Sequence, residues 1–171
     1  MSRQLLILRH AKSTWNTQTT TDFARPLNKR GEHDAPRVGR WLRQQGLIPD
    51  YVVSSPAERA RQTAVKACQA LGIAAECLQW DPRIYDATLE QLLAVLADCP
   101  EIARTVLLVG HNPGLELLLR YLCRSVPAPV DGKLLPTATV AQLKMPADWH
   151  QLNSGTARLI SIVRPASLPK V

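Results

Sequence analysis

Two apolar segments of strand length each end in a histidine, and this feature constrains the fold more than any other in the sequence. Residues 5–8, Leu-Leu-Ile-Leu, lead directly into Arg9 and His10. Residues 105–109, Thr-Val-Leu-Leu-Val, lead through one glycine into His111. Short, continuous apolar runs are typical of strands buried on both faces. In open α/β sheets the carboxyl ends of such strands carry the ligand site, so we expect both histidines at one sheet edge.

The rest of the chain alternates between helix and strand patterns. Helices are expected over 31–46, 57–71, 88–99 and 113–123, and further strands over 51–54, 74–80, 138–143 and 157–163. Ser55 is the expected N-cap of the helix over 57–71, and Thr88 with Gln91 forms a capping-box pattern. We therefore expect one domain over residues 1–171, with three α/β/α layers and a mostly parallel, mixed central sheet.

The amino-acid composition limits which class of protein this chain can belong to. The chain is 46% hydrophobic and 20% charged, which is ordinary for a globular protein. Its four cysteines are scattered without a C-x-x-C pair, which predicts reduced thiols and a cytoplasmic location. No signal-peptide or transmembrane pattern is present in the sequence.

The net charge of +7 indicates anionic partners. Nucleic acid is one such partner, but the basic residues are spread out, with no run of five or more and no recognisable nucleic-acid motif. A phosphate-binding pocket with a solvated basic surface explains the charge equally well. We expect no specific nucleic acid partner and no membrane.

The residues around His10 suit phosphoryl transfer. A neutral imidazole is a nucleophile towards phosphorus, and nearby arginines favour the neutral form by lowering its pKa. Negative charge spreads over the transferred phosphoryl oxygens, and arginine offers them planar, permanently charged donors. Arg9 adjoins His10, and Arg59 falls in the first turn of a predicted helix, beside the positive end of its dipole. The alternative is a pair of structural histidines with solvated arginines.

Three motifs resemble the signatures of the histidine phosphatase (phosphoglycerate mutase-like) superfamily and occur in that family's order. They are Leu-Arg-His-Ala-Lys-Ser at 8–13, Ser-Ser-Pro-x-x-Arg-Ala-x-Gln-Thr at 54–63, and Gly-His-Asn at 110–112. The pattern Asp-x-x-Arg-Pro-Leu-x-x-Arg-Gly at 22–31, the segment 135–138, the late Trp149 and the compact length resemble the SixA branch of phosphohistidine phosphatases. The resemblance covers nearly the whole chain and implies a phosphoglycerate mutase-like fold.

The resemblance also implies roles for the motif residues. His10 would be the phosphorylated nucleophile, and Arg9, Arg59 and His111 would complete the phosphate pocket. Asn16 matches an asparagine that touches phosphate in the mutase branch, so we expect phosphate contact there, with loop stabilisation as the alternative. No metal or other cofactor is expected, because histidine and arginine supply the nucleophile and the charge.

Other polar residues keep open roles. Asp86 lies where the larger family carries an acid that protonates the leaving group, and an exposed turn residue is the alternative. Arg25 either meets the substrate or only pairs with Asp22. Gln62 and Thr63 are expected to pack on or cap a helix, and Ser13 to form hydrogen bonds within its loop. Solvent-facing positions are expected for four charged residues, Arg61, Asp34, Asp81 and Asp98.

The expected substrate follows from what covers the pocket. Between Asp86 and His111 there is room for one helix and one strand, whereas mutase-type members resemble this chain but carry a larger insertion that covers the site. We therefore expect a phosphatase that hydrolyses phosphohistidine on a phosphocarrier or phosphorelay protein through a covalent phosphohistidine intermediate. The alternatives are a small-molecule phosphomonoester phosphatase of the same fold, or a non-catalytic module that binds phosphate or nucleic acid.

Overall fold

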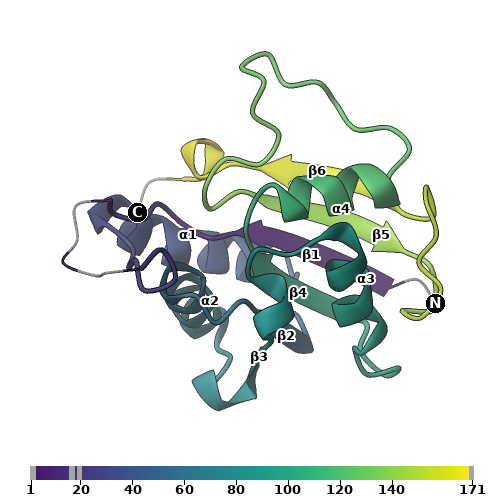
Figure 1. The fold of residues 1–171 in the computed structure, drawn as a ribbon, viewed down its shortest axis with the longest axis horizontal. Coiled ribbons are helices and arrows are strands. Elements are labelled where there is room, and N and C mark those ends of the chain that lie inside the picture. Colours follow the sequence, from purple (N-terminus) through teal and green to yellow (C-terminus); the bar gives the residue numbers. More distant parts are fainter. Residues whose placement is uncertain (1–2, 16–17, 19–20, 170–171) are drawn as a thin grey trace.

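A six-stranded mixed sheet organises the protein (Figure 1). The computed structural model describes residues 3–15, 18 and 21–169. Its strands are β1 (Arg3–Arg9), β2 (Tyr51–Ser54), β3 (Leu78–Trp80), β4 (Thr105–Gly110), β5 (Val140–Met145) and β6 (Arg158–Val163). The strand order is β3-β2-β4-β1-β5-β6. Neighbours among β1 to β4 are parallel, whereas β5 runs antiparallel to β1 and to β6.

Helices cover both faces of this sheet. They are α1 (Lys29–Gln44), α2 (Glu58–Leu71), α3 (Leu89–Ala97) and α4 (Gly114–Leu122), with short 3₁₀ turns at Ala75–Cys77, Pro82–Ile84 and Pro165–Ser167. Side chains alternate along β1, so Leu6 and Leu8 join the core beneath α1 and α2. Leu5 and Ile7 join the core beneath α3 and α4. The expected α/β architecture with a mixed sheet is confirmed.

The pairing of β1 with β4 brings the two histidine segments together. Arg9 lies opposite Gly110 in the parallel register. The backbone N–H of His10 donates to the Gly110 carbonyl oxygen at 3.0 Å, one step beyond the strand. His10 and His111 therefore leave adjacent strands at the same edge of the sheet, as the sequence predicts.

Two local predictions are wrong. Only the second half of the expected strand over 74–80 forms β3, because Ala75–Cys77 is a 3₁₀ turn without buried residues that could hold it against the sheet. Ser55 is not the N-cap of α2, which begins at Glu58 with no side-chain cap. The Ser55 hydroxyl contacts the ring of His111 instead, whereas the capping box of Thr88 and Gln91 is confirmed.

Asp34 is not the surface charge that we expected. It is buried on α1, where its carboxylate pairs with the equally buried Arg37 at 3.1 Å. Arg37 also donates to the backbone carbonyls of Pro165 and Leu168. Its guanidinium therefore fastens the C-terminal segment against α1, which explains why the acid beside it is buried.

The loop after β1 is held against the start of α1 at Gly31. The Asn28 side chain accepts the Gly31 N–H at 2.9 Å and so caps the helix, while the Asn28 N–H donates to the Lys12 carbonyl at 3.0 Å. A Cβ added at Gly31 would stand 2.1 Å from that same carbonyl oxygen. Glycine at this position therefore allows the loop after β1 to pack on the helix.

Gly31→Ala is expected to destabilise the protein by about 1–3 kcal/mol, because the added methyl displaces the Lys12 backbone. A loss of stability would be the opposite of the usual effect, since alanine in place of glycine ordinarily stabilises a helix by roughly 1 kcal/mol. Chemical denaturation measures the change, with exposed Glu32→Ala on the same helix as the control. An unchanged or raised stability in Gly31→Ala would show that the loop is not held here.

Candidate active site

A cavity of about 260 Å³ lies at the carboxyl ends of β1 and β4. Its walls are formed by Arg9, His10, Lys12, Ser13, Trp15, Asp22, Arg25, Arg59, His111, Asn112 and Thr137. The four residues expected to carry the chemistry, which are Arg9, His10, Arg59 and His111, all lie in this one cavity. The two imidazole rings are 5.1 Å apart between centroids.

His10 is held as a neutral imidazole with one nitrogen available. Its Nδ1 lies 2.8 Å from the backbone carbonyl oxygen of Ala11. A carbonyl only accepts, so Nδ1 carries the proton and Nε2 keeps its lone pair. Burial, with smaller contributions from the charges of His111, Arg59 and Arg9, lowers the pKa of His10 to about 3. The side chain is thus in the nucleophilic form at neutral pH.

The Ser55 hydroxyl holds the His111 ring through one of its nitrogens. Its Nε2 lies 2.8 Å from the Ser55 hydroxyl oxygen, which already accepts the Ala57 N–H at 3.2 Å. The hydroxyl proton is then free to donate to Nε2, which favours the proton of neutral His111 on Nδ1. That Nδ1 is buried and has no partner within the described part of the chain. Burial, and then the charge of Arg59, lower the pKa of His111 to about 4.

The two arginines approach from different elements. Arg9 ends β1 and donates from Nη1 to the Leu135 carbonyl at 3.0 Å, while its buried Nε has no partner among the residues described. Arg59 lies in the first turn of α2 and is buried. The two guanidinium groups share one cavity with His10, and they could supply the positive charge that a transferred phosphoryl group needs.

Asp22 links several of the cationic groups. Its carboxylate accepts from Arg59 at 3.0 Å, from Arg25 at 2.7 Å and from the Tyr85 hydroxyl at 2.8 Å. Burial opposes ionisation of this carboxyl, but the hydrogen bonds from Tyr85, Arg25 and Arg59 outweigh it and hold the pKa of Asp22 below its usual range. Arg25 therefore pairs with Asp22 and also lines the cavity, while its contact with the substrate stays a prediction.

Aromatic side chains surround this ionic cluster. The Tyr85 ring meets His111 edge-on at 5.5 Å and Phe23 edge-on at 5.0 Å. Trp15 stacks on the Arg25 guanidinium at 3.4 Å from its ring centroid and is 76% exposed. These rings restrict the directions in which the arginines and His111 can turn, and Trp15 forms part of the rim.

Asp86 is not among the residues that line the cavity. It is exposed and takes a left-handed backbone conformation, with φ of 51°, in the turn between the 3₁₀ segment Pro82–Ile84 and α3. Its neighbour Tyr85 occupies the place beside His111. The role of Asp86 as an acid stays a prediction, and Asn16 lies outside the described residues.

The remaining signature residues serve the structure. The Thr63 hydroxyl accepts the Ala11 N–H and donates to the Arg59 carbonyl, which ties α2 to the catalytic loop. Gln62 accepts the Leu27 N–H at 2.8 Å. Arg61 pairs with Glu58 at 2.6 Å and is 44% exposed along its side chain, so the expectation that it points away from the cavity is confirmed.

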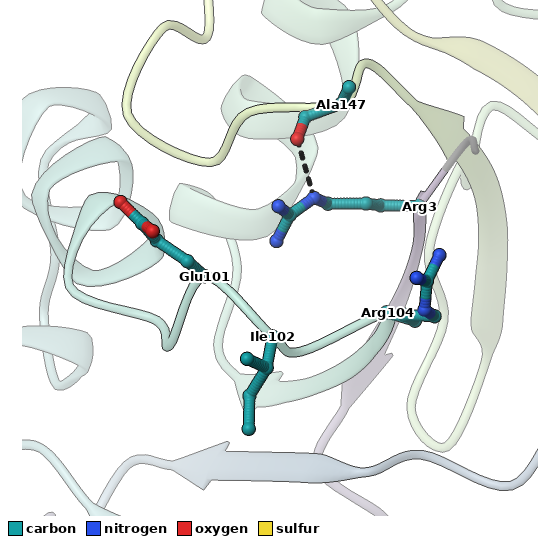
Figure 2. Close-up of a pocket in the computed structure, with 5 residues that line it drawn as sticks. All are labelled: Arg3, Glu101, Ile102, Arg104 and Ala147. Atoms are coloured by element: carbon teal, nitrogen blue, oxygen red, sulfur yellow. Dashed lines mark hydrogen bonds between the residues drawn. The ribbon is translucent and has the colours of Figure 1, made fainter.

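A larger cavity lies at the opposite end of the sheet (Figure 2). It has a volume of about 560 Å³ near the amino ends of β1 and β4 and contains Arg3, Glu101 and Arg104. The Arg3 guanidinium is already bound, because it donates to the carbonyls of Ala147 at 2.7 Å and Ala103 at 2.9 Å. No histidine lines this cavity. Size alone therefore does not mark the site of chemistry here.

The described segments contain neither a metal-binding cluster nor a membrane-spanning helix. Within them, no three histidine, cysteine, aspartate or glutamate side chains are arranged to hold a metal ion. The helices described there include none with the length and apolarity needed to cross a membrane.

The comparisons with known proteins agree with this geometry. A model of the histidine phosphatase superfamily (branch 1) matches residues 5–89. The chain belongs to the histidine phosphatase superfamily. Among similar solved structures of this superfamily is a candidate phosphohistidine phosphatase SixA from Nakamurella multipartita, with a TM-score of 0.82, 29% identity, and coverage of 98% of both chains. The resemblance to the SixA branch is thereby confirmed.

Two relatives by sequence are uncharacterized proteins. One from Mycobacterium tuberculosis is 30% identical to this histidine phosphatase over 92% of the chain and 99% of its own length. A chloroplastic protein of Arabidopsis thaliana is 36% identical over 68% of the chain, and the chain spans only 57% of that protein.

Sequence reasoning missed Ser55 and Tyr85 as partners of His111, and it left Asp22 without a place in the site. Ser55 stands inside a signature motif, which was a usable signal, but its position before a proline suggested a helix cap. Tyr85 directly precedes Asp86, and the sequence pattern indicates this turn without indicating Tyr85. Nothing in the local pattern of either residue indicates a contact with His111.

The first prediction for the site concerns protonation. Because burial holds both pKa values well below 6.5, His10 and His111 should stay neutral from about pH 5.5 to 8. Heteronuclear NMR of ¹⁵N-histidine-labelled protein measures this, and should also show His10 with its proton on Nδ1. His10→Asn and His111→Asn variants assign the signals. A titration midpoint near the ordinary value for either ring would contradict the burial argument.

The second prediction compares two arginines on one helix. Arg59→Ala should lower kcat/KM by roughly 10²–10³, because it removes a preorganised donor from the cavity. Arg61→Ala, two residues away and paired with Glu58, should stay within about threefold of the parent, as is usual for an exposed side chain. Hydrolysis of an aryl phosphate measures both. A critical Arg61 with a dispensable Arg59 would mean that the catalytic face of α2 has been misassigned.

Proposed function

We propose that this enzyme hydrolyses phosphohistidine on phosphorylated proteins through a covalent intermediate on His10. The observation that carries the proposal is the state of His10, which is buried, neutral and tied through Nδ1 to the Ala11 carbonyl, in a cavity that it shares with Arg9 and Arg59. This arrangement supports nucleophilic attack on phosphorus better than it supports a structural role.

In the first step, Nε2 of His10 forms a bond to the substrate's phosphorus. The phosphorus–nitrogen bond to the substrate imidazole breaks, and its electron pair returns to that ring nitrogen, which takes a proton. Arg9 and Arg59 stabilise the equatorial oxygens as charge develops on them. In the second step, water attacks the phosphorus and releases a proton to solvent, while the bond between phosphorus and Nε2 breaks and its electron pair returns to Nε2. Inorganic phosphate leaves, and His10 is again a neutral imidazole.

The choice of a protein substrate rests on how little covers the cavity. Between the turn at Pro82–Ile84 and β4 the chain forms only α3 and its connections. Trp15 at the rim is 76% exposed, so no part of the described chain closes over it. An open cavity admits a side chain that remains attached to a folded protein. A small phosphomonoester is the competing substrate class, and a parallel screen of phosphohistidine peptides and phosphoesters decides between them.

Covalent catalysis predicts a trapped intermediate. Rapid quench with ³²P-phosphohistidine peptide should give a labelled enzyme whose label is labile to acid and stable to base, as expected for phosphorus bound to an imidazole nitrogen. His10→Asn should abolish both the label and turnover, and His33→Asn on the exposed face of α1 is the control. Full turnover in His10→Asn would overturn the proposed mechanism.

Asp86 is tested by changing the leaving group. If Asp86 donates a proton, Asp86→Asn should harm hydrolysis of alkyl phosphates far more than of aryl phosphates or phosphohistidine, since strongly basic leaving oxygens need the proton most. Rates on the three substrates are compared within one variant. Equal losses on all three would assign Asp86 to cavity shape, and no loss on any would leave it as an exposed turn residue.

A further inference from the structure

A second cavity adjoins the active site and is positively charged. It has a volume of about 400 Å³ and is lined by Arg9, Lys12, Arg30, Glu116, Gly132, Lys133, Leu135, Pro136 and Thr137. We call it the basic cavity. It shares Arg9, Lys12 and Thr137 with the active-site cavity. A ligand in one cavity can therefore extend into the other.

The cations of the basic cavity are largely uncompensated. Within the described residues, the ammonium groups of Lys12 and Lys133 have no hydrogen-bond or ion-pair partner, and both side chains are exposed. Arg30 is 67% exposed along its side chain, with only a long contact of 3.5 Å to Asp34. Glu116 is the single acid, and its carboxylate accepts from Asn112 at 2.5 Å. The net charge therefore favours an anionic ligand.

The wall of the basic cavity is fastened to the catalytic residues. Residues 132–137 belong to the long loop between α4 and β5, which projects beyond the sheet in Figure 1. The Leu135 carbonyl in this loop accepts from Arg9 at 3.0 Å and from Asn112 at 2.9 Å. The position of Lys133 relative to His10 is thus set by hydrogen bonds at the base of the loop.

We propose that the basic cavity binds an acidic segment next to the phosphorylated histidine of a protein substrate. The inference rests on the proposed function and specifies its substrate. Three exposed cations, on the catalytic loop, at the start of α1 and on the projecting loop, suit carboxylates spaced along a protein surface. The loop also exposes Val130 fully, three residues before Lys133, where a protein surface could contact it.

Binding of an acidic peptide tests the proposal without any turnover. Fluorescein-labelled hexaglutamate should bind the parent protein at low salt, measured by anisotropy, while labelled hexaglutamine should not. Arg30→Glu with Lys133→Glu should weaken the binding at least about tenfold. Thermal unfolding checks that the double variant is folded.

The matched control is Lys144→Glu with Arg158→Glu. These exposed residues are paired across β5 and β6 near the amino end of β1, far from the active site, and the net charge changes equally. Affinity for hexaglutamate should stay within about twofold of the parent. Equal losses in both double variants would show that only the overall charge matters and would overturn the proposal. The proposal would also be overturned if hexaglutamate did not bind while tripolyphosphate bound through Arg30 and Lys133.

A second arm uses turnover. Two phosphohistidine peptides of equal length, one with glutamate and one with glutamine flanks, should differ in kcat/KM in favour of the acidic one. Arg30→Glu with Lys133→Glu should remove or invert that preference. A preference that survives in this variant would overturn the proposal. If neither peptide is hydrolysed while an aryl phosphate is, the proposed function fails, and the hexaglutamate measurement alone decides the fate of the basic cavity.

Discussion

The parallel pairing of β1 with β4 is the interaction on which the rest of the site depends. It places Arg9 opposite Gly110, so the residues that follow the two strands lie side by side at the carboxyl edge of the sheet. The two strands are far apart in sequence, and α1, α2 and α3 lie between them along the chain. α2, one of these helices, then presents Arg59 to the same edge. The site is a consequence of sheet topology, which is the general rule for open α/β folds.

The Asp22 carboxylate already binds one of the arginines that the proposed mechanism assigns to phosphate. Asp22 binds Arg59 through its side chain and also through its backbone carbonyl, at 2.8 Å. It accepts from Arg25 and Tyr85 as well. The Asp22 carboxylate, which is 47% exposed along its side chain, therefore holds Arg25 and Arg59 in place and offsets the repulsion between their charges. A phosphoryl group, with more oxygens and more charge, can compete for the same donors.

The sequence specified the strands and motif residues well because their signals are local. Apolar runs that end in histidine predict strand ends, and the motif spacing placed Arg59 in the first turn of α2. The contacts that orient these groups could not be read in the same way. Asp22 and Tyr85 meet only because two separate loops fold over the same sheet edge. Asp34 is buried for a similar reason, since its partner Arg37 binds the C-terminal segment, whose approach no pattern along α1 reveals.

The cavity combines an uncharged histidine nucleophile with positively charged arginines. Burial is the largest cause of the low pKa of His10, so this ring is neutral before any phosphate is present, and the neighbouring arginines act in the same direction. An incoming phosphoryl dianion is attracted to those arginines and does not repel an uncharged imidazole. His111 is neutral for the same reason, and its Nδ1 has no partner within the described residues. In the proposed mechanism this division of charge separates binding from attack: Arg9 and Arg59 would bind the phosphoryl oxygens, and His10 would attack the phosphorus with its lone pair.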